Sequence, residues 1–274
     1  MELQLGGQTY SLVEDPGDKY VVTGGTVAFC DRLAEDFKPI VIDAHGYGSK
    51  PQPPEFMAYR AVAGPGRRML CLLYEFYWRR QDCDWRGLNK DHAHDYEQIQ
   101  VHFDMEEKRL DKVVVSSVGP PGCAGHGVEV YAHVDEKTWR MVDYVTSPKH
   151  AFPWGGSGGR NWFTQVREMP LRLLLFSDNR PVVQVVSCYH VFSGVKIDRP
   201  RKMGPKLEIE LRRLDTELLE RWYLQHFKNR FGHDISKPQE EPHQMYYPPP
   251  EDWISRIAYV LLWTVRTIRR RLGF

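Results

Sequence analysis

The feature that most constrains this chain is a set of segments rich in β-branched and aromatic residues, each bounded by turn-forming residues. This composition favours β-strands. The segments at residues 69–78 and 182–192 are almost continuously apolar, which is typical of central strands covered on both faces. Shorter segments of the same kind occupy residues 96–104, 112–118 and 128–134. The sequence therefore predicts a β-rich core.

Size and charge narrow the class of protein. With 274 residues, the chain is long enough to bury a hydrophobic core without disulfide bonds or a bound structural metal. Lys and Arg total 37 against 36 for Asp and Glu, a formal charge of +1. Because a nucleic-acid-binding domain usually carries a strong positive excess, nucleic acid is not an expected partner. The five cysteines form no Cys-x-x-Cys pair, which argues against a zinc ribbon.

The last quarter of the chain has a different pattern. Apolar residues recur every three or four positions up to Gly232, which predicts an amphipathic helix; they are Leu207, Leu211, Leu214, Leu218 and Trp222. A Pro-rich linker follows at residues 238–250. The expected fold class is therefore α+β, with a β-sandwich-like core at residues 1–200 and an α-helical C-terminal extension at residues 201–274.

Residues 251–274 predict a second, basic helix. Its longest apolar run, residues 257–265, is too short to span a bilayer, and five arginines but no acids follow residue 252. This pattern is typical of a helix lying in the plane of a membrane surface, although docking on the protein's own surface is the alternative. The expected membrane-facing residues are Trp253, Ile257, Leu261, Trp263, Arg266, Arg269 and Arg270. Since the N-terminus shows no secretory signal, the expected location is cytoplasmic, peripheral at the membrane.

The most informative run for function is Asp91-His92-Ala93-His94-Asp95-Tyr96-Glu97, which leads into an apolar strand. Side chains alternate between the two faces of a strand. If Ile99 and Val101 face the core, then Asp95 and Glu97 point to that same face. The alternation therefore predicts two inward-facing carboxylates at the entrance of one strand.

Inward-facing carboxylates require cations, hydrogen-bond donors or a metal. Oxygen-rich sites suit Mg²⁺, Ca²⁺ or Mn²⁺, whereas the neighbouring His92 and His94 would also suit zinc. The alternative is a solvated loop in which the acids pair with Lys90 or Arg79.

The same run resembles the Gly-His-Arg-His-Asp-Trp-Glu heptapeptide of the necrosis- and ethylene-inducing cytolysin family. An aromatic strand precedes it and an apolar strand follows it, and the similarity covers about residues 69–155. Asp91, Ala93 and Tyr96 replace the Gly, Arg and Trp of the family pattern.

The resemblance implies a β-sandwich that holds a divalent cation, Mg²⁺ or Ca²⁺, in an acidic cavity. His92, Asp95 and Glu97 would be the metal-site residues, and Asp82 or Asp84 would supply the Asp that the family places in the preceding loop. Members of the family bind membrane sphingolipid glycans, which implies a polar head group or sugar as the ligand.

Three further residues are candidates for the same site: His126 and His150, from neighbouring loops, and Glu75, which interrupts the aromatic strand. For Glu75, a salt bridge to Arg60 or Arg79 is the alternative. The expected function is therefore divalent-cation binding on a cytolysin-like scaffold, for recognition of a polar head group or glycan at a membrane surface. Two alternatives are a metal-dependent hydrolase that activates water at the His/Asp/Glu cluster, and a non-catalytic structural or interaction protein.

Overall fold

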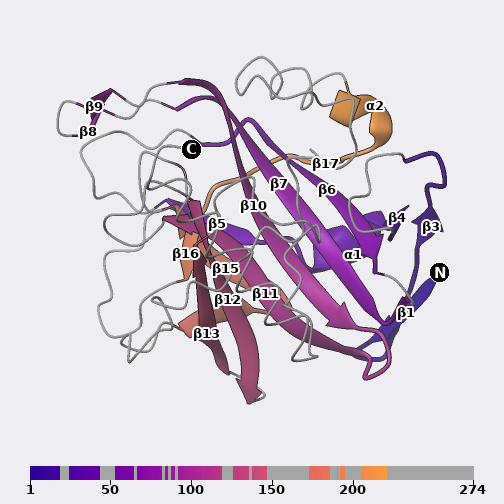
Figure 1. The fold of residues 1–274 in the computed structure, drawn as a ribbon. Helices are drawn as coiled ribbons and strands as arrows, with labels where there is room; N and C mark the ends of the chain where they lie inside the picture. Colours follow the sequence, from indigo (N-terminus) through magenta and orange to yellow (C-terminus); the bar gives the residue numbers. More distant parts are fainter. Residues whose placement is uncertain are drawn as a thin grey trace, which may run out of the picture.

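The computed structural model describes residues 1–18, 25–43, 53–64, 67–81, 84–85, 88–89, 92–118, 126–135, 138–146, 173–185, 190, 192–194 and 205–220. Most of these residues form β-strands, and nearly all strand pairs are antiparallel (Figure 1).

One large sheet contains most of the strands. In order of pairing, its antiparallel path runs through β16 (Phe192–Gly194), β15 (Arg180–Val185), β14 (Leu173–Ser177), β13 (Thr138–Thr146), β12 (His126–Asp135), β11 (Arg109–Val118), β10 (His92–Asp104), β7 (Met69–Gln81), β6 (Phe56–Ala63), β4 (Thr26–Phe29) and β3 (Val13–Glu14). Two further strands join it in parallel: β5 (Ile40–Asp43) pairs with β15, and β17 (Leu211–Arg213) pairs with β6. Two small hairpins stand apart from it, β1 (Glu2–Leu5) with β2 (Gln8–Ser11), and β8 (Asp84–Trp85) with β9 (Leu88–Asn89).

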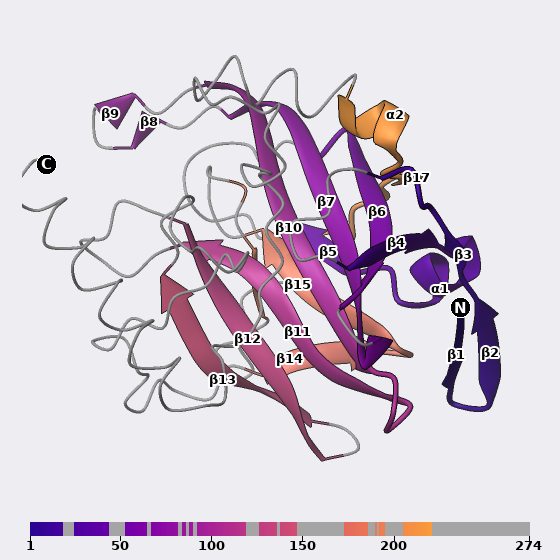
Figure 2. The same ribbon diagram turned by 45° about the vertical axis from the view of Figure 1, so that its right-hand side comes forward.

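The sheet folds back on itself to make two layers. In Figure 2, β14 and β15 pass behind the layer that contains β10 and β11. Phe192 of β16 packs edge-on against Phe76 of β7, with ring centroids 4.7 Å apart. Val183 of β15 belongs to the same buried cluster as Leu72 and Ile99. This arrangement is consistent with the predicted β-sandwich-like core.

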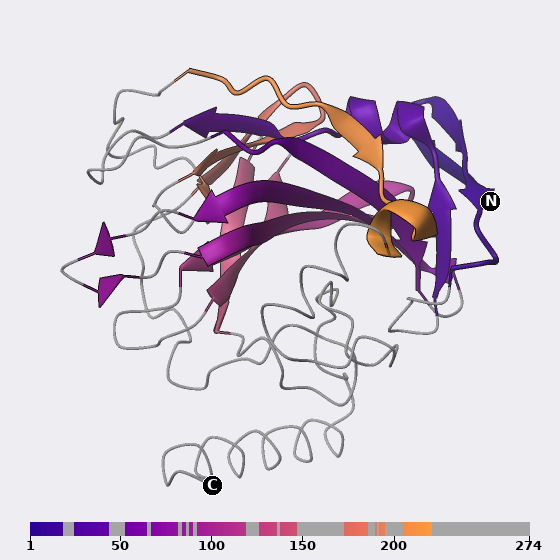
Figure 3. The ribbon, with the colours of Figure 1, turned by 90° about the horizontal axis from the view of Figure 1, so that it is seen from above.

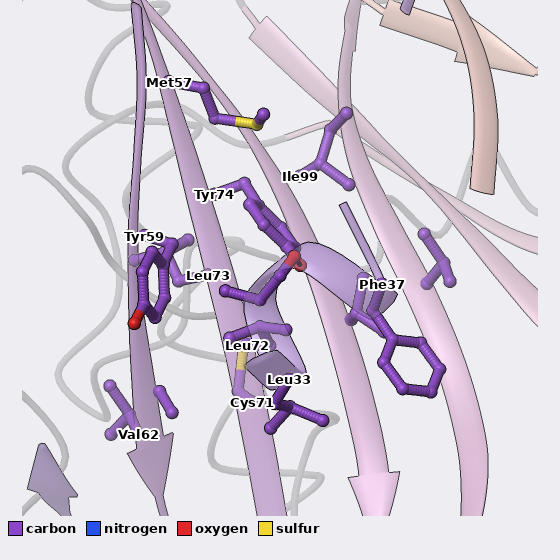
Figure 4. Packing of buried hydrophobic residues seen from close by; sticks show 14 of the residues in the cluster. Leu33, Phe37, Met57, Tyr59, Val62, Cys71, Leu72, Leu73, Tyr74 and Ile99 are labelled. Atoms are coloured by element: carbon purple, nitrogen blue, oxygen red, sulfur yellow. Dashed lines mark hydrogen bonds between the residues drawn. The ribbon is translucent and has the colours of Figure 1, made fainter. Parts of the chain in front are cut away.

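The core lies between these layers and is closed by the helix α1 (Asp31–Asp36). Leu33 of α1 is fully buried, and Phe37 packs edge-on against Phe103 of β10 at 4.9 Å. The hydroxyl of Tyr74 donates a hydrogen bond to the carbonyl oxygen of Ala34 at 2.7 Å. Figure 4 shows this contact region, where β7 and β10 meet the helix.

The N-terminal hairpin lies beside α1, as Figure 3 shows from above. Tyr10 of β2 donates a hydrogen bond from its hydroxyl to Asp36 Oδ2 of the helix at 2.7 Å. Burial and this carboxylate raise the pKa of Tyr10 to about 12. The hairpin is therefore attached to the end of α1, and its buried Leu3 and Leu5 also join the main core cluster.

The prediction of an α+β fold with an α-helical C-terminal extension is wrong for the residues that the structure describes. Where the helix is predicted to begin, at Leu207, the structure has extended chain up to Leu214, followed by the three-residue helix α2 (Thr216–Leu218). The part of the predicted helix from residue 221 to Gly232 lies outside the described residues. The reason is visible in Lys206-Leu207-Glu208-Ile209-Glu210-Leu211, where apolar and charged residues alternate with period two. Ile209 is buried between exposed glutamates, and its position contradicts a helical face.

A helix begins only where a cap residue allows it. Asp215 Oδ1 accepts a hydrogen bond from the backbone N–H of Leu218 at 2.7 Å, which is the geometry of an N-cap. Leu214 and Leu219, on either side of α2, then pack with Tyr77 and Tyr96 in a second, smaller apolar cluster. Within the described residues, neither helix has the length or apolar content to cross a membrane.

Candidate functional site

The pairing of β10 with β7 decides which side chains share a face. Asp95 lies opposite Trp78 and Glu97 opposite Phe76, and both aromatic residues belong to the main core cluster. Ile99, opposite Tyr74, continues this side, which we call the core face. As the alternation predicts, both acids are buried on it: Asp95 is 0% exposed and Glu97 is 3% exposed. This burial excludes the solvated loop for these two residues.

Asp95 is paired with a histidine that is distant in sequence. Nδ1 of His190 lies 2.9 Å from Oδ2 of Asp95, and both side chains are buried. A carboxylate oxygen can only accept, so His190 donates this hydrogen bond through a protonated Nδ1. The ring is thereby oriented, and Nε2 is the nitrogen left to meet another group. Arg79, the arginine considered as a partner from the sequence, pairs instead with Glu55 at 2.7 Å.

His190 is held from a second side by an aromatic ring. Its imidazole lies parallel to the indole of Trp78, with centroids 4.5 Å apart and an interplanar angle of 1°. Two residues later, Phe192 contacts both Phe76 and Trp78. His190 and Phe192 therefore both contact aromatic residues of β7 on the core face.

The backbone of His190 is in the left-handed region, with φ at 55°. For a residue with a Cβ atom, this conformation costs about 1–2 kcal/mol and persists where surrounding contacts fix it. Here the fixing contacts are the hydrogen bond to Asp95 and the stacking on Trp78. Strained residues of this kind concentrate at functional sites.

A third acid is buried on the core face further along the sheet. Glu129 of β12 lies opposite Val115, which in turn lies opposite Ile99. Glu129 is 0% exposed, and the hydroxyl of Tyr131 donates a hydrogen bond to its Oε2 at 2.5 Å. The register places it two strands from β10 and level with Ile99, so it belongs to the same face but lies away from Asp95.

The other predicted site residues fall into three groups. Glu75 is buried, but it lies opposite Gln98 on the reverse side of the sheet and does not join Asp95 and Glu97. His92 and His94 belong to β10, Asp84 to β8 and His126 to β12, and their side chains lie outside the described part of the structure. Asp82, His150 and the seven expected membrane-facing residues lie outside the described residues altogether.

The reverse side of β10, which we call the second face, carries a neutral polar ladder. His102 Nε2 lies 3.0 Å from Gln100 Oε1, and Gln100 Nε2 donates to Gln98 Oε1 at 3.1 Å. Because an amide oxygen only accepts, His102 carries its proton on Nε2. Burial lowers the pKa of His102 well below its usual range, and the positive charge of Lys112 on β11 lowers it further. His102 is therefore a neutral, hydrogen-bonded histidine.

The donor chemistry of the core face fits a hard divalent cation only in part. Two buried carboxylates are suitable oxygen donors, and a hydrogen bond such as the one from His190 is a common support for a ligating carboxylate. Among the described side chains, however, no three His, Cys, Asp or Glu residues gather closely enough to hold a metal ion. A complete set would need further ligands, for which the candidates are His92, His94, Asp82 and Asp84.

The sequence reasoning missed His190 and Glu129. A signal for His190 exists, because it interrupts the apolar run at residues 182–192 at a position where a strand would bury it. The structure shows that this run is not one strand: β15 ends at Val185 and β16 begins at Phe192. Its contact with Asp95, 95 positions earlier, could not be read from spacing.

Comparison with known proteins adds no assignment: no family model, no curated protein and no solved structure matches this chain.

Proposed function

We propose that this chain binds a divalent cation beside Asp95 and Glu97, near the start of β10 where it pairs with the end of β7. The bound cation would hold a polar head group or glycan. The observation that carries the proposal is the burial of Asp95 and Glu97 on one face, one pleat apart. Two buried carboxylates so close together repel each other and favour a cation between or beside them. The resemblance of residues 91–97 to the cytolysin heptapeptide supports the same conclusion.

In this proposal Asp95 and Glu97 are carboxylate ligands, and His92, His94, Asp82 and Asp84 are the candidates for the rest. Oxygen-rich ligation favours Mg²⁺ or Ca²⁺, with Mn²⁺ or Zn²⁺ as alternatives if His92 or His94 takes part. A bound cation would supply positive charge to which hydroxyl or phosphate oxygens of a ligand can bind. The protein itself shields the two carboxylates from water, because Trp78 and Phe76 lie beside them.

Isothermal titration with Mg²⁺, Ca²⁺, Mn²⁺ and Zn²⁺ tests the cation site. We expect saturable binding by the wild type and a loss of affinity of about tenfold or more in Glu97→Gln, which keeps the shape and removes the charge. Asp104→Asn is the matched control, because Asp104 lies at the other end of the same strand and accepts the N–H groups of Glu106 and Glu107 at 2.9 Å. Wild-type protein that binds none of the four ions would overturn the proposal.

The membrane part of the proposal is supported by the sequence of residues 251–274 alone. Flotation with phosphatidylcholine and phosphatidylserine vesicles tests it, using the full chain and a variant with Arg269 and Arg270 changed to Glu. We expect the wild type to float with anionic vesicles and the variant to float less. Equal flotation would remove the membrane from the proposal and leave the cation site standing.

The pair formed by Asp95 and His190 favours a second candidate function, hydrolysis. An imidazole oriented by a carboxylate at Nδ1 can accept a proton from water at Nε2, which is how a general base is held in many hydrolases. Turnover of ester or phosphodiester substrates by the wild type, lost in Asp95→Asn, would favour this function over binding alone.

A further inference from the structure

Residues 205–214 connect two strands that lie in different layers, and we call this segment the strap. Near its start, the backbone N–H of Leu207 donates a hydrogen bond to the carbonyl oxygen of Val41 in β5 at 2.8 Å. At its end, β17 pairs with β6, and the backbone N–H of Leu214 donates to the carbonyl oxygen of Tyr59 at 2.7 Å. In Figure 3 the strap belongs to the orange segment that leads into α2.

The strap closes a circuit of strand pairing. β5 pairs with β15 near one end of the large sheet, and β6 lies beside β7 toward the other end. The intervening strands already connect β15 to β7, through β14, β13, β12, β11 and β10. Because the strap pairs with both β5 and β6, it joins the two layers by a second route.

We infer that the strap is a latch: it opens and closes as one unit while the large sheet stays folded, and the ion pair between Arg213 and Asp31 helps to keep it closed. The latch is separate from the proposed cation site. Its opening would uncover residues 57–59 of β6 on the side where β17 now pairs, because β4 covers only residues 61–63 of the same edge.

The strap is held less firmly than the strands that it joins. β7 and β10 pair along almost their whole length, whereas the ladder between the strap and β6 spans residues 211–213. Its pairing with β5 is one isolated bridge, at Lys206. Ile209 in the middle of the strap is buried, but Leu207 and Leu211 are only partly buried. A segment with short pairing and little buried apolar surface opens at a lower free energy than the core.

Arg213 ties the strap to α1 and to β6. Its Nε donates to Oδ1 of Asp31 at 2.7 Å and its Nη2 donates to Oδ2 at 2.5 Å, so the guanidinium holds the carboxylate through two hydrogen bonds. The hydroxyl of Tyr59 in β6 donates to the same Oδ1. The guanidinium also lies over the ring of Phe29 in β4, 5.7 Å from its centroid. Since Asp31 begins α1, one carboxylate connects three elements.

This ion pair is accessible to solvent, so its strength can vary with the solution. The side chains of Arg213 and Asp31 are 51% and 61% exposed. Salt screens charges that are exposed in this way. By contrast, the ion pair of Lys206 with Glu208, at 3.3 Å, lies within the strap and does not tie it to the other elements.

Amide hydrogen exchange of the full-length protein, followed by NMR, tests the latch. The N–H groups of Leu207 and Leu214 bond from the strap to the two layers, and the N–H of Met57 donates to the carbonyl oxygen of Glu210 at 2.9 Å. We expect these amides to show one common protection factor that is lower than that of Ile99 in β10. Unequal protection among them, or protection equal to that of Ile99, would overturn the inference.

Two variants separate opening of the strap from unfolding of the sheet. Arg213→Gln removes a contact that breaks when the strap opens, so the protection of the strap amides should fall about two- to fivefold. Ser116→Ala removes the acceptor of the Gln98 N–H, a contact inside the sheet, and should lower the protection of Ile99 without changing the strap amides. Lys206→Gln is the matched control and should change neither. Strap amides that are unaffected by Arg213→Gln, or that fall together with Ile99 in Ser116→Ala, would contradict the latch.

A measurement on the wild type alone covers the case in which Arg213→Gln fails to fold. Raising NaCl from about 50 mM to about 500 mM should lower the protection factors of Leu207, Leu214 and Met57, because salt weakens the ion pair of Arg213 with Asp31. Protection factors that do not fall over this range would show that the ion pair does not hold the strap.

Discussion

The two faces of β10 handle buried polar groups in opposite ways. On the core face, Asp95 and Glu97 follow the apolar residues Ile99 and Val101 toward the start of the strand, and Asp95 is hydrogen-bonded to the strained His190. On the second face, Gln98, Gln100 and His102 form a continuous ladder of neutral side chains. The comparison concerns the side chains of β10 alone, because Glu75 of β7 is also buried on the second face, opposite Gln98. It teaches that burial by itself does not mark a site: within β10, the acids and the strained histidine lie on the core face, and the neutral side chains lie on the second.

The largest effect we expect is the loss of stability on truncating a buried side chain of the core face. Phe103 is fully buried and packs against Phe37, so Phe103→Ala should lower the free energy of unfolding by about 3–5 kcal/mol. Urea denaturation measures it. Val13→Ala is the control, because Val13 is 71% exposed and its change should stay within about 0.5 kcal/mol. A loss below about 1 kcal/mol in Phe103→Ala would show that the core does not lie on this face.

The second face should make stability depend on pH. His102 is neutral in the folded protein because its pKa lies well below the usual 6.5, whereas in the unfolded chain it titrates near that value. Below pH 6.5 the unfolded chain therefore binds the additional proton, so this contribution to stability is complete above pH 6.5 and is lost as the pH falls. Each unit of pH below 6.5 should cost about 1.4 kcal/mol, until the folded-state pKa is reached.

Urea denaturation between pH 7.5 and 5.5 tests this dependence, a range that stays above the ordinary pKa of carboxylic acids. In His102→Asn the slope should flatten, because the titrating group is gone. An equal slope in the wild type and the variant would show that His102 is not a neutral residue in the fold, and the contrast between the two faces would then be lost.

Part of the fold and of the candidate site can be predicted from the sequence. Alternation along β10 predicts the burial of Asp95 and Glu97, because the period of a strand is fixed at two and Ile99 and Val101 set its phase. The apolar run at residues 69–78 predicts a central strand, and β7 pairs on both sides. These inferences succeed because they depend on local geometry.

Other features depend on contacts between distant residues or on competing periodicities. The pairing of His190 with Asp95 requires the sheet to fold back, which no local pattern encodes. The helix predicted to begin at Leu207 is wrong for the described residues because Leu207 and Leu211 fit both periods, and the buried Ile209 between them decides for the strand. Glu75 points away from the other acids because its parity on β7 is that of Tyr77, not of Trp78.

The smallest effect concerns the link between β10 and β11. The backbone N–H of Gln98 donates to Ser116 Oγ at 3.1 Å, and Ser116 is 6% exposed. Ser116→Ala removes this acceptor and should cost about 0.5–1.5 kcal/mol, with no effect on cation affinity because Ser116 lies on the second face. Ser116→Thr keeps an oxygen at the same position and is the matched control. If Ser116→Ala weakened cation binding while its stability stayed near that of the wild type, the two faces would be coupled, and the separation between a polar ladder and a charged site would have to be abandoned.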